Sequence, residues 1–409
     1  MQQTLKTFIL LTMVFLGAMA ALARAEGIEL EQRMRVAPFL MEGLLQVASG
    51  DLDGDGLCEL VVLGRDYTEP QVLVHVLKAD TESGELAQVW QSPNILEERS
   101  PAHLAVGAFL TQGRRLILVL TNNRAELYGW EEKQGYRRQA AYTHNIAPGE
   151  VTAGDLDGDG RDELIVARVA KTGLKHYYEQ LLVYRVEEDE LVLLSEGPVL
   201  GNIRAVAAGD LDGDGRDEVL AEVGKASADG EIHIYSNEGA KWVRRAEPVT
   251  LADGAVYGMT VTRGTEGSFV YTASEQGCLH IFRWTGSGLQ AVAEKKVNLS
   301  LYSVAPGGFW ADHWGLALLY YPNGLWVLAG PANPGIMALE EALAAKTKVD
   351  SAEPAQGLVP SEGSMPETGG EDAPLSVGGQ AEAVPAGPDN PGVDGPGETV
   401  TAPEAVPQK

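Results

Sequence analysis

A sixfold internal repeat constrains the fold of this chain more than any other feature. The copies start at Val47, Leu104, Val151, Val206, Met259 and Val304. Three of them carry the phrase GDLDGDG followed by β-branched apolar residues, as in VTAGDLDGDGRDELIVAR from Val151, and the other three keep the apolar pattern without the aspartates. A period of about 50 residues is typical of propellers and other repeat architectures, in which one supersecondary unit recurs.

Each copy is followed by an apolar strand, a polar turn and another strand, as in EIHIYSNEGAKWVRR from Glu231. Alternating apolar residues around turns such as NEG predict hairpins, so each unit contains four strands. The sixth unit ends after three strands at LWVLAG, and the segment ELEQRMRVAPF from Glu29 supplies the missing strand. The sequence therefore predicts an all-β, six-bladed β-propeller over residues 27–330, closed by its N-terminal strand. Seven blades is the alternative, if the stretch Tyr177–Gln180 contains an additional strand.

In the phrase DLDGDGxxE the carboxylates occupy positions 1, 3, 5 and 9, and glycines occupy positions 4 and 6. This spacing turns hard oxygen ligands toward one point, which suits Ca²⁺, and a glycine at position 6 lets the backbone reverse. The predicted carboxylate ligands are Asp51, Asp53, Asp55 and Glu59, then Asp155, Asp157, Asp159 and Glu163, then Asp210, Asp212, Asp214 and Glu218. The predicted carbonyl ligands are those of Leu57, Arg161 and Arg216.

The loops are not EF-hands, because position 12, where an EF-hand has its bidentate glutamate, falls inside a predicted strand. An acidic turn without metal is the alternative, and it is disfavoured because four clustered carboxylates repel one another. We expect about three structural Ca²⁺ sites.

The strand–GDxDGDGxxE–strand unit resembles the FG-GAP or VCBS repeat family, whose repeats form the blades of integrin α-subunit propellers and occur in many exported bacterial proteins. The resemblance extends over residues 27–330; it is specific in the three acidic copies and weak in the others. It implies a propeller with Ca²⁺ held on one rim, in the loops that join the first and second strands. It implies no activity, because such propellers serve adhesion, carbohydrate binding and lyase chemistry.

Regions outside the repeat suggest export. Residues 1–25 have a charged start, an apolar core and a small-residue end, which predicts a signal peptide cleaved after Ala25, a secreted or extracytoplasmic protein, and no stable membrane span after cleavage. Residues 331–409 are rich in Pro, Gly and Glu and predict a disordered tail with one short helix near residues 335–348. The net charge of −27 excludes nucleic acid and anionic membranes as partners.

The histidines, aromatic residues and cysteines discussed next are expected to have structural roles and to form no shared catalytic or metal site. The histidines His75, His233 and His280 share one position in the third strand of separate units, which separates them in space. The aromatic group Phe309, Trp310, His313 and Trp314 is expected to wedge between blades rather than to bind sugar. The two cysteines, Cys58 and Cys278, are expected on opposite rims as free thiols. No GxSxG, HExxH or phosphate-binding glycine motif is present.

These features predict a secreted, Ca²⁺-stabilised propeller that binds an extracellular protein or polysaccharide, as an adhesion module does. The rim opposite the acidic loops would bind the partner, through the loops Arg65–Tyr67, Asn122–Arg124 and Lys171–Tyr178. Two alternatives stay open: a carbohydrate-active enzyme similar to a polysaccharide lyase, and a structural scaffold of the cell envelope. Whether the chain is an enzyme is therefore uncertain at this point.

Overall fold

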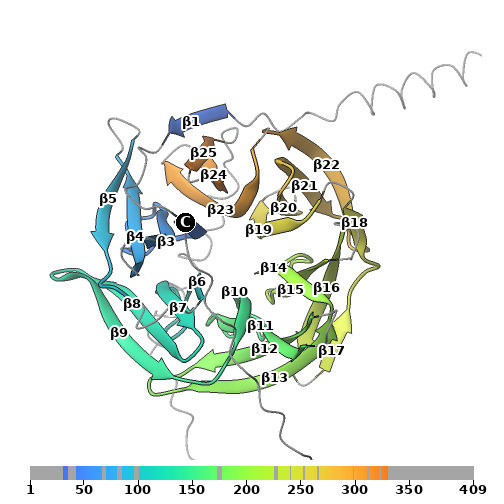
Figure 1. The fold of residues 1–409 in the computed structure, drawn as a ribbon, viewed down its shortest axis with the longest axis horizontal. Helices are drawn as coiled ribbons and strands as arrows, with labels where there is room; N and C mark the ends of the chain where they lie inside the picture. Colours follow the sequence, from blue (N-terminus) through green and yellow to red (C-terminus); the bar gives the residue numbers. More distant parts are fainter. Residues whose placement is uncertain are drawn as a thin grey trace, which may run out of the picture. The chain divides into compact units, whose positions relative to one another are not determined.

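The computed structural model describes residues 31–329 except 36–42, 67–70, 81–84, 96–100, 173–176, 225–228, 240, 252–253, 265–266, 298, 311–312 and 322–323. The described residues form antiparallel strands and no helix. They make six sheets arranged as blades around a centre (Figure 1), so the predicted six-bladed β-propeller is confirmed. The predicted signal peptide (1–25) and tail helix (335–348) lie outside the described residues.

Each blade is a four-stranded meander whose innermost strand comes first, except that the last blade takes its outer strand from the start of the chain. Blade 1 contains β2 (Gly43–Gly50), β3 (Glu59–Asp66), β4 (Gln71–Ala79) and β5 (Leu86–Gln91). Blade 2 contains β6 (Ala102–Gly107), β7 (Leu116–Thr121), β8 (Arg124–Glu131) and β9 (Gly135–Thr143). Blade 3 contains β10 (Pro148–Gly154), β11 (Glu163–Thr172), β12 (Tyr177–Val186) and β13 (Leu191–Leu200).

The remaining strands complete the ring. Blade 4 contains β14 (Asn202–Gly209), β15 (Glu218–Gly224), β16 (Gly230–Glu238), β17 (Lys241–Arg244) and β18 (Val249–Leu251). Blade 5 contains β19 (Val256–Gly264), β20 (Gly267–Ser274), β21 (Cys278–Trp284) and β22 (Leu289–Lys296). Blade 6 contains β23 (Leu301–Trp310), β24 (His313–Tyr320), β25 (Gly324–Ala329) and β1 (Glu31–Arg35).

The core consists of six apolar clusters, one between each pair of neighbouring blades. The second strands are the most buried, because a blade covers each of their faces; every residue of β7 is buried, for example. Burying both faces explains why these strands read as continuous apolar runs and not as alternating ones. The clusters between blades therefore hold the ring together.

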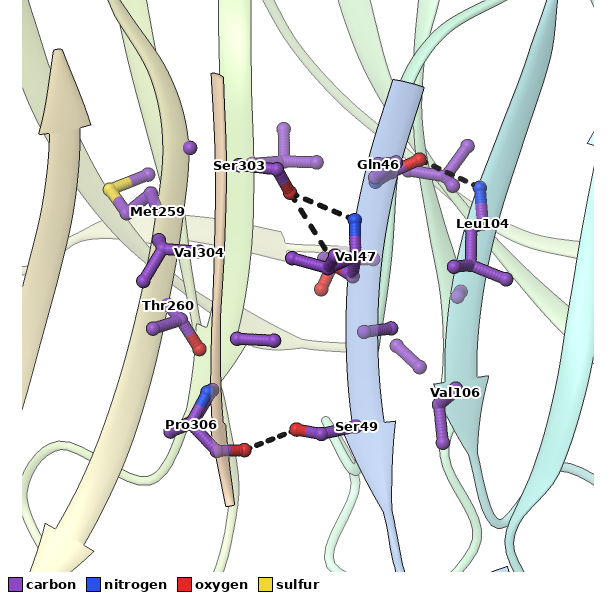
Figure 2. A pocket seen from close by; sticks show the side chains of 18 of the residues that line it. Gln46, Val47, Ser49, Leu104, Val106, Met259, Thr260, Ser303, Val304 and Pro306 are labelled. Atoms are coloured by element: carbon purple, nitrogen blue, oxygen red, sulfur yellow. Dashed lines mark hydrogen bonds between the residues drawn. The ribbon is translucent and has the colours of Figure 1, made fainter. Parts of the chain in front are cut away.

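The N-terminal strand closes the ring as predicted. Strand β1 pairs antiparallel with β25, with Glu31 opposite Ala329 and Arg35 opposite Trp326. The inner strands of blades 6 and 1 are also joined, because the Val47 N–H donates to Ser303 Oγ at 3.1 Å and the Ser49 hydroxyl donates to the Pro306 carbonyl (Figure 2). Pairing with β1 covers the edge of β25 and gives the last blade its fourth strand.

The seven-bladed alternative is wrong. The stretch Tyr177–Gln180 begins β12 and pairs with β11 and β13 inside blade 3, so it adds no sheet. Blade 4 does differ from the predicted pattern, because its fourth strand is split into β17 and β18. Pro248 lies directly before β18, and proline has no N–H to donate to a continuous ladder.

Several packing predictions are confirmed. Phe309 is buried between blades 6 and 1, and Trp314 packs on Tyr271 between blades 5 and 6 with ring centroids 5.6 Å apart. Both cysteines are buried, and neither is in a disulfide. The three histidines His75, His233 and His280 lie in β4, β16 and β21 of different blades, so they form no common cluster. Within the described part of the chain, no helix has the length and hydrophobicity that a membrane span requires.

Candidate functional site

The acidic loops of blades 1, 3 and 4 have one backbone design. In blade 1 the glycines at positions 4 and 6, Gly54 and Gly56, have φ of 81° and 87°, a region that residues with a Cβ rarely adopt. The carboxylate of Asp51 at position 1 accepts hydrogen bonds from both glycine N–H groups, at 2.7 and 3.0 Å. Asp155 and Asp210 accept the same pair of bonds in blades 3 and 4. The aspartate at position 1 therefore fixes the turn in all three loops.

The glutamate at position 9 is the first residue of the second strand and is buried in each loop. Glu59, Glu163 and Glu218 have exposed fractions of 0%, 2% and 2%. Each accepts a hydrogen bond of 2.8 to 3.0 Å from the N–H of the buried leucine at position 2. Burial raises the pKa of all three carboxyl groups, to about 7 for Glu163 and Glu218. Each loop thus places an ionisable oxygen pair where water reaches it poorly.

Three of the four predicted carboxylates of each loop converge. One oxygen from each of positions 1, 3 and 9 lies within 4.8 Å of the other two, in the groups Asp51, Asp53 and Glu59, Asp155, Asp157 and Glu163, and Asp210, Asp212 and Glu218. The position-5 carboxylates are not members of these groups. They accept the N–H of position 7 at 2.8 to 2.9 Å, in the pairs Asp55 with Leu57, Asp159 with Arg161, and Asp214 with Arg216.

A basic side chain that the sequence analysis missed reaches the carboxylates of blade 1. Lys78 of β4 contacts Asp53, and its Nζ lies 2.7 Å from Asp55 Oδ2 and 3.0 Å from Glu59 Oε1. Glu59 Oε1 is buried and makes no hydrogen bond, so its contact with Lys78 is an ion pair without hydrogen-bond geometry. The lysine therefore neutralises one of the four negative charges of this loop.

Blade 3 has the same arrangement with arginine. Arg185 of β12 lies 2.6 Å from Asp157 Oδ2 and 3.1 Å from Glu163 Oε1. Arg185 and Lys78 share one register, three residues after the position that His75 occupies in blade 1. That shared register is the sequence signal by which both residues could have been found.

Blade 4 obtains its basic group from a different strand. Ser236 occupies the register of Lys78 and Arg185, and Arg245, which follows β17, contacts Asp212 and lies 4.0 Å from Glu218 Oε1. A basic side chain thus reaches the acidic loop in all three blades, from the third strand in blades 1 and 3 and from the residue after β17 in blade 4. Because a basic residue is present near each loop although its position in the blade differs, we infer that four clustered carboxylates require partial neutralisation within the chain.

The residues fit a divalent cation. When all four carboxylates of a loop are ionised, one basic side chain faces them in blades 1 and 3, which leaves an excess of three negative charges. In blade 4 both Arg245 and Arg263 face them, because Arg263 contacts Asp210, and the excess is two. The converging atoms are all carboxylate oxygens, the hard donors that Ca²⁺ prefers, and Glu59 Oε1 has no hydrogen bond. Such a cluster is favourable for a small cation of charge two.

The residue at position 8 joins neighbouring blades, a role that the sequence analysis also missed. The Asp217 N–H donates to the Asp155 carbonyl at 2.8 Å, and Asp217 Oδ2 accepts from the Asp155 N–H at 3.0 Å. Asp162 makes the same pair of bonds with Ala108 of blade 2, at 3.1 and 2.7 Å. Gly154 allows this approach, because a Cβ there would lie 2.8 Å from Asp217 Oδ2. The acidic loops therefore also connect the blades.

A central cavity of about 640 Å³ is lined by the inner strands of all six blades. Figure 2 shows part of its wall, where the Leu104 N–H of blade 2 donates to Gln46 Oε1 of blade 1 at 2.8 Å. Near the starts of the inner strands, on the rim opposite the acidic loops, the wall includes His103, Glu150, Tyr257 and Tyr302. This cavity mouth is the second candidate site.

Two partly buried ionisable groups line this end of the cavity. Burial lowers the pKa of His103 to about 4, so its ring is neutral, and one ring nitrogen bonds to the Pro148 carbonyl. The other nitrogen, Nε2, is buried and makes no hydrogen bond. Burial, with repulsion from Glu179, raises the pKa of Glu150 to about 8. The cavity mouth thus presents neutral polar groups that can bond to a ligand.

The predicted recognition loops belong to the same rim, where second strands lead into third strands. Arg65 is near the end of β3 and lines the cavity, whereas Tyr67 lies outside the described residues. The range Asn122–Arg124 forms the turn between β7 and β8. The range Lys171–Tyr178 joins β11 to β12, with 173–176 outside the described part.

A scan against models of known protein families gives no match, and a search of curated proteins gives none. Among solved structures, the chain is similar to two crystal structures of BBS1N in complex with ARL6DN, one soaked with mercury and one with lead. The identity is 11% in both, and the alignments cover 75% of this chain and 99% and 98% of the other chains. The TM-scores are 0.46 and 0.47.

Proposed function

We propose that this protein is an exported, Ca²⁺-binding propeller that binds an extracellular protein or polysaccharide through the rim opposite its acidic loops. The observation that carries the metal assignment is the threefold recurrence of one loop, in which a buried glutamate and two aspartates bring three oxygens within 4.8 Å of one another. Burying a carboxylate is costly unless it is paired, and a bound cation would add to the pairing that the basic side chain of each loop supplies.

Bound Ca²⁺ would supply positive charge and cross-links between oxygens, and no reaction is assigned to it. The carboxylates of positions 1, 3 and 9 would hold the ion, joined by the position-5 carboxylate and the position-7 carbonyl after a small rearrangement of the loop. Because Asp155 is both a proposed ligand and the partner of Asp217, metal binding in blade 3 would also strengthen the contact between blades 3 and 4.

The binding role rests on the opposite rim. The inner strands surround a cavity with ionisable and aromatic side chains at its mouth, and concave sites with a few polar groups are where proteins usually bind ligands. Export rests on the leader-like residues 1–25, and an acidic chain is consistent with a Ca²⁺-rich extracellular setting. The family resemblance of the acidic repeats is compatible with a binding module and does not by itself distinguish it from an enzyme.

Thermal melting in EDTA, Ca²⁺ and Mg²⁺ tests the metal assignment. A site that binds only the folded protein stabilises it by about 2.7 kcal/mol when the free ligand is at one hundred times its Kd. We therefore expect Ca²⁺ to raise the Tm by several degrees over EDTA, and to do so more than Mg²⁺, which demands octahedral geometry.

A triple variant sharpens the test. Asp53→Asn, Asp157→Asn and Asp212→Asn remove the position-3 charges and retain an oxygen that can accept the N–H of position 5. This variant should lose the Ca²⁺ dependence, whereas Asp189→Asn, at an exposed turn, should keep it. A wild-type Tm that responds neither to chelator nor to Ca²⁺ would refute the metal assignment.

A further inference from the structure

Three tyrosines form a continuous aromatic surface at the mouth of the central cavity. Tyr257 and Tyr302 are the second residues of the inner strands β19 and β23, and Tyr321 directly follows β24. The ring centroids of Tyr257 and Tyr302 are 5.7 Å apart, and those of Tyr302 and Tyr321 are 6.3 Å apart. We propose that this tyrosine platform binds a neutral oligosaccharide, an inference that rests on the proposed binding function of this rim and specifies its ligand.

The platform is open to solvent. Tyr257 and Tyr321 have exposed fractions of 36% and 62%, and Tyr302, between them, is partly exposed. Buried aromatic rings elsewhere in the protein fill the spaces between blades, as Phe309 does, so exposure of three adjacent rings is not explained by packing. Adjacent exposed aromatic side chains at a cavity mouth are typical of a binding surface.

The ring geometry favours a flat ligand over a cation. The rings contact one another, with interplanar angles of 34° and 64°, so no ammonium group fits between two ring faces as it would in an aromatic cage. The apolar C–H face of a sugar ring packs on such a surface, while the tyrosine hydroxyls bond to the sugar hydroxyls.

A second observation lies inside the cavity that Tyr257 and Tyr302 line. His103, from the corresponding start of β6, lines the same cavity, and its Nε2 is buried and without a hydrogen bond. Because the ring is neutral and its other nitrogen bonds to the Pro148 carbonyl, Nε2 is an acceptor. A buried acceptor without a partner is costly, and a sugar hydroxyl that enters the cavity would satisfy it.

The charge around the platform selects against acidic sugars. Glu275, exposed after β20, acts together with burial to raise the pKa of the Tyr302 hydroxyl. The nearby guanidinium of Arg204 is already committed to Glu222, with its Nε 2.9 Å from Glu222 Oε2. With Arg204 paired and the Glu275 carboxylate exposed, the charges beside the tyrosines disfavour an anionic glycan there, whereas a neutral one has both donors and acceptors to bond to. Arg65, which also lines the cavity on this rim, belongs to blade 1.

A glycan array that carries neutral and acidic oligosaccharides, followed by calorimetric titration of the neutral oligosaccharide with the strongest signal, tests the inference on the full chain in Ca²⁺. We expect binding to neutral oligosaccharides. Tyr302→Ala should weaken it at least tenfold because Tyr302 contacts both other rings, and Tyr302→Phe should retain most of it. Leu194→Ala, at a 42% exposed side chain of the outer strand β13 and away from the cavity mouth, is the control and should bind like the wild type.

The outcomes separate this inference from the proposed function. No signal on neutral oligosaccharides, or equal affinity of Tyr302→Ala and wild type, overturns the tyrosine platform. If the protein binds another macromolecule and Tyr178→Ala abolishes that binding, the rim function stands and the platform fails. The Tm of each variant in Ca²⁺ should equal that of the wild type within a few degrees. If Tyr302→Ala unfolds, Tyr302→Phe still tests the inference, because it keeps the ring and should retain most of the binding.

Discussion

Replacing Glu150 with glutamine removes a carboxyl group whose ionisation the fold opposes. Burial and repulsion from Glu179 raise the pKa of Glu150 from 4.5 to about 8. Below pH 4.5 the carboxyl is protonated in both the folded and the unfolded protein and costs nothing. Between pH 4.5 and 8 the unfolded protein releases this proton and the folded protein does not, so the free energy of unfolding falls as the pH rises.

The size of the effect follows from the shift. A change of about 3.5 units at about 1.36 kcal/mol per unit gives an upper bound of about 5 kcal/mol. Because the Glu150 side chain lines a cavity that water can enter, we expect about 2 to 3 kcal/mol. Glutamine keeps the size of the side chain and has no charge to desolvate, so Glu150→Gln should abolish this part of the pH dependence.

Urea denaturation of both proteins at pH 5, 7 and 8.5 in saturating Ca²⁺ measures the difference. Glu150→Gln should match the wild type at pH 5 and exceed its free energy of unfolding by about 2 to 3 kcal/mol at pH 8.5. The control Glu132→Gln, at an exposed turn, should track the wild type throughout. A difference between Glu150→Gln and wild type that is equal at pH 5 and pH 8.5 would refute the reasoning.

Three other perturbations have defined outcomes. Lys78→Met removes a positive charge next to three carboxylates, so calorimetric titration should show one Ca²⁺ site that binds more tightly, and unchanged affinity would contradict the role given to Lys78. Gly154→Ala places a Cβ 2.5 Å from the Ala208 Cβ, so urea denaturation should show a loss of about 1 to 3 kcal/mol, whereas Gly308→Ala, with open space at the Cβ, should change stability little. Deleting residues 26–36 removes β1 and exposes β25, so the Tm should fall and size-exclusion chromatography should show association; a stable monomer would disprove the closure role of β1.

The architecture could be predicted because each blade repeats the same pattern of apolar strands and polar turns in the sequence. The recurrence at Val47, Val151 and Val206 fixed the period, and the three strands at the end of the sixth unit required a fourth from elsewhere, which is β1. The split of the fourth strand in blade 4 is a local consequence of Pro248. The repeat pattern predicts the four strands that all blades share and does not show the effect of one proline in one blade, so the split was not predicted.

The candidate sites were predictable only where chemistry is local in sequence. The acidic loops place their ligands within nine residues, so the convergence of Asp51, Asp53 and Glu59 follows from spacing. Lys78 reaches the same carboxylates from another strand, and the sequence alone does not give the side-chain direction that brings it there.

The three tyrosines of the platform are farther apart in the sequence than the carboxylates of any acidic loop. Tyr257, Tyr302 and Tyr321 come from two blades, and only the ring brings them together. Nothing in the spacing of these residues distinguishes them from buried tyrosines such as Tyr271. Whether a tyrosine side chain is exposed therefore depends on where its strand begins relative to the cavity mouth. A sequence pattern locates the start of a strand only to within a residue or two.

The number of Ca²⁺ ions bound per chain tests the account most directly. Equilibrium dialysis of the metal-stripped protein against Ca²⁺, with metal analysis of the retentate, should give three ions per wild-type chain. The Asp53→Asn, Asp157→Asn, Asp212→Asn variant should retain none, because each substitution removes one converging charge from one loop. A folded wild-type protein that binds no Ca²⁺ would contradict the account, because the three recurrent loops would then be turns whose carboxylates are neutralised by side chains such as Lys78, Arg185 and Arg245.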